Sequence, residues 1–198
     1  MYRAIRIATV LILGSLAAGC AFGERQASLA YPPATDKALI SSAEAAPTSR
    51  GREMYIGIFG DVRPNKMIVG NMRNTLGWKT AEVVAQRDVP GWVREALAYE
   101  LKASGYQVMD GVAPEGGATI SGEIVQVYVD SHLTYDGEVT LRMEFGKAGQ
   151  SLIQRVYTGT GSAGLVVVGA GERFSRSLSI ALQSALRQFI ADLGQHLG

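Results

Sequence analysis

The single cysteine of the chain, Cys20, follows a run of small residues close to the N-terminus. The run reads Leu16-Ala17-Ala18-Gly19 and matches a lipobox, the motif at which a signal peptidase cleaves directly before a cysteine. In such a motif the thiol receives a diacylglycerol and the cysteine becomes the new N-terminus. The usual leucine three residues before the cysteine is displaced by one position, because Ala17 holds that place. The motif predicts lipidation of Cys20.

The residues before this motif supply the other parts of an export signal. Arg3 and Arg6 form a short basic segment, and residues 7–13 form an apolar one. A bilayer span needs about 20 apolar residues, so an apolar segment of about 12 to 14 is too short to serve as a membrane anchor. We therefore expect residues 1–19 to be a cleaved lipoprotein signal peptide.

A lipidated Cys20 is expected to hold the protein durably at a membrane through palmitate-type acyl chains. A processed bacterial lipoprotein carries several such chains, and each buried methylene contributes about 0.8 kcal/mol. The next residue, Ala21, is not the aspartate that, by resemblance to enterobacterial lipoproteins, retains a protein in the inner membrane. The sequence therefore favours an outer-membrane location with the domain facing the periplasm.

A glycine motif late in the chain is the strongest hint of a cofactor. Gly159, Gly161 and Gly164 have the G-x-G-x-x-G spacing of a dinucleotide-binding turn and follow a predicted strand. A dinucleotide site also requires a helix opening at the third glycine and a second parallel strand beyond it. Residues 165–171 make a poor helix, and no strand follows the last helix. We therefore expect a flexible or bulged connection and no bound cofactor.

Other polar residues do not form a recognisable catalytic or metal-binding pattern. Asp61 and Arg63 could join Asp130 and His132 in a small polar site if their loops converge, although turn-capping aspartates and solvated arginines are far more common. His132 and His196 are the only histidines and lie far apart in the sequence, so no metal site is expected.

Two further features have ordinary structural explanations. Trp78 and Trp92 could stack a sugar or a peptide, but each lies where a core or edge-covering aromatic is expected. Serines are numerous, yet no G-x-S-x-G nucleophile elbow occurs. No catalytic residues are therefore assigned, and we expect the protein not to be an enzyme.

The hydrophobic pattern predicts an α+β domain with a mixed, mostly antiparallel sheet of about five to six strands packed by two helices. Asp88, Pro90 and Ser104-Gly105 delimit a helix over residues 89–103, and a second amphipathic helix is expected over residues 172–197. Strands are expected at 54–59, 78–84, 106–109, 119–129, 138–145 and 151–158, with a loop at 66–77 that encloses a short extended piece at 67–69.

The predicted organisation has three parts. Residues 1–19 are the signal peptide, residues 20–53 a lipid-anchored flexible tether, and residues 54–198 a single periplasmic domain. The tether is rich in Ala, Ser, Pro and Thr, and a flexible segment of its length would span about 30 Å. Within it, residues 28–31 are a candidate for docking on the domain.

Composition narrows the classes of partner. The formal charge of the full chain is +1, and loss of Arg3 and Arg6 with the signal peptide changes it to −1. Nucleic-acid binding favours a clustered basic face, so no nucleic acid is expected as a partner. Once Cys20 is acylated, no thiol remains for a disulfide or for a cysteine-ligated metal. Packing alone must therefore stabilise the domain.

The order of these features resembles the YajG-type lipoproteins of Gram-negative envelopes. The resemblance rests on the lipobox at Cys20, on Asp61-Val62-Arg63 after the first strand, on the helix and strand over 93–108, on the strand segment 124–130 and on the last helix. It implies an envelope location and an α/β sandwich, and it implies no activity.

The leading expectation is a non-enzymatic outer-membrane lipoprotein whose periplasmic domain binds another envelope component, a protein. An alternative is an accessory or carrier subunit for lipid or small-molecule transport, with a cavity between the sheet and the helices. A hydrolase acting on the cell wall is the weakest hypothesis, because the sequence contains no evident acid pair or nucleophile–base set.

Overall fold

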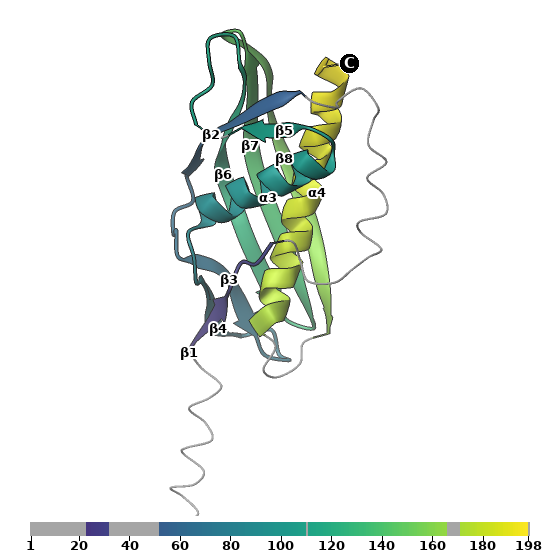
Figure 1. Cartoon of the computed structure of the whole chain (residues 1–198). Coiled ribbons are helices and arrows are strands. Elements are labelled where there is room, and N and C mark those ends of the chain that lie inside the picture. Colours follow the sequence, from purple (N-terminus) through teal and green to yellow (C-terminus); the bar gives the residue numbers. More distant parts are fainter. Residues whose placement is uncertain (1–22, 32–51, 110, 166–170, 198) are drawn as a thin grey trace, which may run out of the picture.

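The strands of the described residues form one mixed sheet, and both helices lie on the same face of it (Figure 1). The structure is a computed structural model that describes residues 23–31, 52–109, 111–165 and 171–197. The elements are β1 (Gly23–Ala27), β2 (Glu53–Asp61), β3 (Ile68–Arg73), β4 (Lys79–Ala85), α3 (Val89–Ala103), β5 (Gln107–Met109), β6 (Ala118–Ser131), β7 (Thr134–Lys147), β8 (Gln150–Leu165) and α4 (Gly171–Leu197). The α+β class is confirmed, with an 8-stranded sheet where about five to six strands were expected.

The sheet is built around β6, which has partners on both edges. Along one edge β6 pairs antiparallel with β7, and β7 pairs antiparallel with β8. The other edge is shared by two shorter strands that are both parallel to β6: β2 pairs with residues 119–124 and β3 with residues 129–131. β5 lies outside β2, and β4 and then β1 lie outside β3.

Local capping signals set the ends of α3. The Asp88 carboxylate accepts a hydrogen bond from the backbone N–H of Gly91 at 2.7 Å, and a proline occupies the first turn. At the other end, the backbone N–H of Ser104 donates to the carbonyl groups of the last turn, and Gly105 has a positive φ of 87°. The predicted bounds of this helix are therefore confirmed.

The N-terminal part of the predicted tether belongs to the folded domain. β1 pairs in parallel with β4, and Ala27, Leu29 and Tyr31 are buried in the core. The backbone N–H of Leu29 donates to Ser175 Oγ on α4 at 3.2 Å, which confirms the docking of residues 28–31. The assignment of residues 23–27 to a flexible tether is wrong, because backbone pairing with β4 holds this polar segment in the sheet. Residues 32–51 lie outside the described residues.

Two segments that were predicted as loops form strands over part of their length. Residues 68–73 form β3, where only a short extended piece was expected within a loop. The glycine-rich segment that begins at Gly159 continues β8 as far as Leu165, so its assignment as a connection is wrong over these residues, although the expected bulge is present as a register shift against β7 between Ser162 and Leu165. In both cases long-range pairing, with β6 and with β7 respectively, supplies the backbone partners.

The core lies between the sheet and the two helices. Its large and fully buried side chains include Trp92, Leu97, Leu101, Phe145, Leu186 and Phe189. Edge-to-face ring pairs contribute to it: Tyr135–Phe174 with centroids 5.0 Å apart and Tyr157–Phe189 with centroids 5.6 Å apart. No helix in the described residues combines the length and the apolar character needed to cross a bilayer.

Candidate functional site

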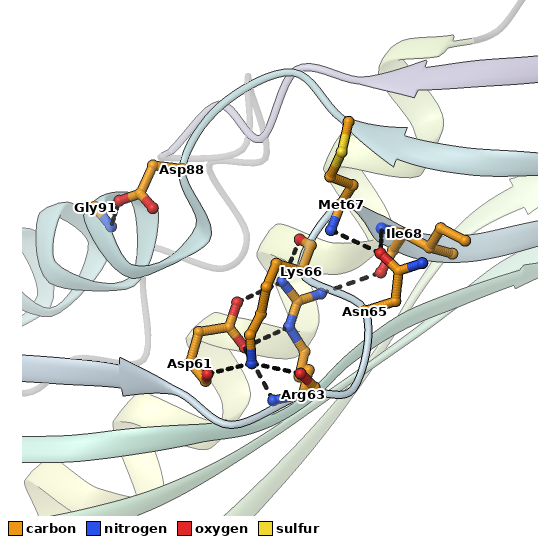
Figure 2. Close-up of polar contacts among 8 residues, drawn as sticks. All are labelled: Asp61, Arg63, Asn65, Lys66, Met67, Ile68, Asp88 and Gly91. Atoms are coloured by element: carbon orange, nitrogen blue, oxygen red, sulfur yellow. Dashed lines mark hydrogen bonds and ion pairs between the residues drawn. The ribbon is translucent and has the colours of Figure 1, made fainter.

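Asp61 and Arg63 lie where β2 leaves the edge of β6, and they form an ion pair that is closed off from solvent (Figure 2). The side chain of Arg63 is only 4% exposed. Its Nε donates to Asp61 Oδ1 at 3.0 Å and its Nη2 to Asp61 Oδ2 at 2.8 Å, a bidentate geometry. The pair therefore holds the chain at the point where one parallel strand ends and the next has not yet begun.

The same cluster also binds the loop between β2 and β3. Arg63 donates to the carbonyl oxygens of Ile68 at 3.2 Å and Lys66 at 2.7 Å, and Lys66 Nζ donates to the carbonyl oxygens of Asp61 and Arg63 (Figure 2). Burial alone would raise the pKa of Asp61, but the hydrogen bonds and charge of Arg63, with Lys66, bring the pKa below its usual value. An ionised carboxylate held in this way orders the loop and leaves little capacity for proton transfer.

The hypothesis that Asp61 and Arg63 converge with Asp130 and His132 is wrong. Asp61 is in register with Ile124 of β6, six residues before Asp130, which corresponds to about 20 Å along a strand. Asp130 instead pairs with Arg73 Nε at 2.8 Å. His132 Nε2 lies 3.4 Å from the carbonyl oxygen of Thr75.

A second polar cluster, centred on Glu100, lies between α3 and α4. The Glu100 side chain is 3% exposed, and its Oε1 accepts hydrogen bonds from Tyr31 Oη at 2.6 Å and from Gln183 Nε2 at 2.8 Å. Its Oε2 accepts a hydrogen bond from Arg187 Nε at 3.2 Å. The cluster joins three segments that are distant in sequence: the N-terminal segment, α3 and α4.

The chemistry of the Glu100 cluster is that of a structural lock. Burial, and then the hydrogen bond to the Glu100 carboxylate, raise the pKa of Tyr31 well above its usual range, so its hydroxyl stays protonated and continues to donate. A buried carboxylate with three donors is well satisfied in place. The sequence did not predict this cluster, although a signal was available: Glu100 is the one charged residue in the otherwise apolar stripe of α3.

The first two glycines of the motif lie under α4. A Cβ atom on Gly159 would come within 2.1 Å of the Ala181 carbonyl oxygen, and one on Gly161 within 2.5 Å of the Ser177 carbonyl oxygen. These glycines therefore let the helix backbone lie directly on β8. The third, Gly164, has a positive φ of 76° near the end of the strand.

The remaining candidate residues are dispersed. No group of three or more His, Cys, Asp or Glu side chains within the described ranges is placed to hold a metal ion. Trp92 is fully buried in the core, whereas Trp78 is exposed. His196 lines an open depression of about 590 Å³, together with residues at the start of β2, before β6 and around the β7–β8 turn. The predicted lipidation site, Cys20, lies outside the described residues.

Comparisons with known proteins identify relatives of the fold only. No protein-family model matches the chain, and no curated protein matches its sequence. Protein XCC0632 from Xanthomonas campestris, assigned to family model DUF330, aligns with a TM-score of 0.55 and 8% identity over 87% of this chain and 94% of that one. The hypothetical protein CT253 from Chlamydia trachomatis aligns with a TM-score of 0.50 and 9% identity over 74% of this chain and 98% of that one.

A third solved structure, lipoprotein GNA1162 from Neisseria meningitidis, aligns with a TM-score of 0.36 and 11% identity, covering 74% of this chain and 97% of that one. A likeness at that score carries no argument about this chain. The two stronger alignments show that the arrangement of sheet and helices recurs in bacterial proteins, and at this identity they say nothing of activity.

Proposed function

We propose that the protein is a non-enzymatic lipoprotein of the outer membrane, and that its periplasmic domain binds another envelope protein. The observation that carries the anchor is the lipobox at Cys20, which stands only three residues before the first strand of the folded domain, at Gly23. The resemblance to YajG-type lipoproteins points to the same location. Acyl chains on Cys20 would hold the protein durably, since more than one chain is buried.

The absence of an enzymatic role is part of the proposal. In the described part of the chain, the two most buried ion-paired clusters, around Asp61 and around Glu100, use their hydrogen bonds to hold segments of the backbone and the two helices together. The one hydroxyl beside a carboxylate in these clusters, that of Tyr31 on Glu100, is buried, and its raised pKa keeps it protonated, which makes it a poor nucleophile. A carrier role would need a cavity between sheet and helices, and large side chains fill the described core there.

The free edge of β8 is the surface that best supports protein binding. This 16-residue strand pairs with β7 on one side, and no described strand pairs with its other side. Arg155 is its only charged residue, and it contains no proline. Long edges with few charges and no proline are templates for an added strand. Two carbonyl oxygens of β8, those of Thr158 and Leu165, already accept hydrogen bonds from side chains of α4.

Photocrosslinking in intact cells tests the binding proposal. A photoreactive amino acid replaces Val156 or Thr160, both exposed on β8, and in a matched control it replaces Val112, which is 94% exposed in the loop between β5 and β6. We expect one dominant protein adduct from the β8 positions and none from the control position. Equal and diffuse adducts from all three positions would contradict the proposal.

Membrane fractionation tests the anchor separately. The Cys20→Ala protein should leave the membrane fraction and should not incorporate labelled palmitate, while the unchanged protein does both. Retention of Cys20→Ala in the membrane would contradict the anchor and would leave the crosslinking result to be explained by another form of attachment.

A further inference from the structure

One end of the sheet carries exposed apolar side chains from three separate segments. Leu76 and Trp78 lie in the β3–β4 turn, Leu133 in the β6–β7 turn and Leu165 at the end of β8, and their exposed fractions range from 63% to 74%. The register places these segments at one end, because Met72 of β3 is level with Ser131 of β6, and Thr134 of β7 is level with Leu165. We refer to these four residues as the apolar end.

The turn that presents Trp78 is held in a defined shape. Asn74 Oδ1 accepts hydrogen bonds from the backbone N–H groups of Leu76 and Trp78, both at 3.0 Å. The Asn74 N–H donates to the Trp78 carbonyl oxygen, and Arg73 Nη1 donates to the carbonyl oxygen of Gly77 at 3.1 Å. The folded conformation of this turn therefore exposes the large apolar side chains, and no local unfolding is needed to expose them.

The strand nearest to the predicted anchor, β1, begins at this same end. β1 and β4 are parallel, with Gly23 level with Ala81, so both strands begin at one end of the sheet. Trp78 is three residues before Ala81, and Cys20 is three residues before Gly23. Three residues reach at most about 10 Å. An acylated Cys20 would therefore bring the membrane surface close to Trp78.

We infer that the apolar end is a membrane-contact surface that inserts into the interface of the lipid bilayer beside the acyl chains. This inference rests on the proposed lipid anchor and adds an orientation to it. Tryptophan favours the boundary between headgroups and acyl chains, and interfacial side chains reach about 5–10 Å into that layer. The anchor confines the domain near the surface, so a few apolar side chains are enough to orient it.

Two charged pairs flank the apolar end, and the nearby Arg173 donates to the carbonyl oxygen of Leu165. Arg73 contacts Asp130 at 2.8 Å, and Lys79 contacts Glu82 at 2.7 Å. Membrane contact is therefore apolar in origin and should persist at high salt, where attraction between a basic surface and anionic lipids would be screened. In this orientation α4, about 40 Å long, runs away from the membrane, and the C-terminal end lies furthest from it (Figure 1).

The two tryptophans make the test direct, because Trp78 is 70% exposed and Trp92 is fully buried. The acylated mature protein, which is expected to begin at Cys20, is reconstituted in vesicles of phosphatidylethanolamine and phosphatidylglycerol that contain phosphatidylcholine with brominated acyl chains. Brominated chains quench tryptophan emission only on close approach. We expect the brominated lipid to quench Trp78 emission strongly, in low and in high salt. Quenching by aqueous acrylamide should be several-fold weaker than for the same protein without vesicles.

Two variants serve as controls for position. Trp78→Phe leaves only Trp92, whose emission should be insensitive to the brominated lipid. The double variant Trp78→Phe/Val112→Trp moves the exposed tryptophan to the loop that precedes β6, at the opposite end of that strand from Leu133. Its emission should be quenched by acrylamide and not by brominated lipid.

The mass of the Cys20 peptide is measured in the same preparation. If Cys20 is acylated and Trp78 is still quenched by acrylamide alone, or if Val112→Trp is quenched by lipid as strongly as Trp78, the inference is wrong and the anchor stands. If Cys20 is unmodified, the proposed anchor is wrong, and this inference fails with it.

Discussion

Glu100 illustrates how a single buried side chain joins segments that local sequence patterns treat separately. It accepts hydrogen bonds from Tyr31, Gln183 and Arg187, so the N-terminal segment and both helices meet at one carboxylate. Removing one partner from a buried polar cluster leaves the others without their hydrogen bonds, which costs more than the net value of the bonds themselves.

We therefore expect Glu100→Ala to lower the free energy of unfolding by about 3 kcal/mol. Glu95→Ala on the same helix is a matched control, because Glu95 is exposed and pairs with Arg87 in solvent. That change should cost less than about 1 kcal/mol. Urea unfolding of both variants checks the prediction, and similar losses in the two would show that the Glu100 cluster is not a stabilising lock.

Ionisation of Tyr157 is expected to lower the stability of the protein at alkaline pH. Burial, and then the hydrogen bond to Asp192, raise its pKa to about 12, whereas an unfolded tyrosine titrates near 10. Its contribution is therefore fully present below about pH 10 and is lost as the pH rises from 10 to about 12.

Between pH 9 and 11 the free energy of unfolding of the unchanged protein should fall by about 1 kcal/mol more than that of Tyr157→Phe, which lacks the ionisable group. Urea titrations at the two pH values measure this difference. Equal losses in both proteins would contradict the assignment.

At the scale of elements, the packing of α4 on β8 depends on glycine. Gly159→Ala should lower the free energy of unfolding by about 3 kcal/mol, because the new Cβ would lie 2.1 Å from the Ala181 carbonyl oxygen and the helix must move. Gly194→Ala provides the contrast, since nothing lies within 4 Å of its Cβ position and alanine favours a helix by about 0.5–1 kcal/mol. The melting temperature should fall for Gly159→Ala and rise for Gly194→Ala. An unchanged melting temperature for Gly159→Ala would refute the close contact.

The elements also show which parts of the fold the sequence can reveal. The bounds of α3 are predictable because Asp88, Pro90 and Gly105 act through bonds to near neighbours. β1 carries no such signal: four of its five residues are exposed, and only pairing with β4 makes it a strand. The glycines at 159 and 161 matched a phosphate-binding motif because the spacing alone cannot tell a bound phosphate from a helix backbone.

In the candidate sites too, contacts between near neighbours are predictable from the sequence and long-range contacts are not. Asp61 and Arg63 interact with each other within one turn, so their pairing was within reach of sequence reasoning, whereas convergence with Asp130 depended on the register between β2 and β6. In the Glu100 cluster, Tyr31 precedes Glu100 by 69 positions and Arg187 follows it by 87. No local sequence pattern encodes contacts over such separations. The apolar end likewise emerges only when the turns are placed side by side.

At the scale of the whole molecule, the domain begins at Gly23 and not after the expected tether. A chain starting at Gly23 should match the stability of the unacylated full-length protein. A chain starting at Pro32 loses β1 and the buried Leu29 and Tyr31 and should be less stable by at least about 4 kcal/mol. Urea unfolding compares them, and equal stability of the two truncated chains would show that residues 23–31 are dispensable for the fold.

This early start shortens the link between the proposed anchor and the domain. Only Ala21 and Phe22 separate Cys20 from β1, so the domain would be held against the membrane surface by its apolar end. The free edge of β8 runs along the sheet between this end and the opposite one, so a partner strand could pair with it at some distance from the bilayer (Figure 1).

The most direct test of this account is the mass of the N-terminal peptide of the protein isolated from the membranes of the cells that make it. We predict that the peptide begins at Cys20 and carries a diacylglycerol on the thiol and a fatty acid on the new amino group. A peptide that begins at Met1, or a Cys20 with a free thiol, would contradict the lipid anchor and the orientation built on it.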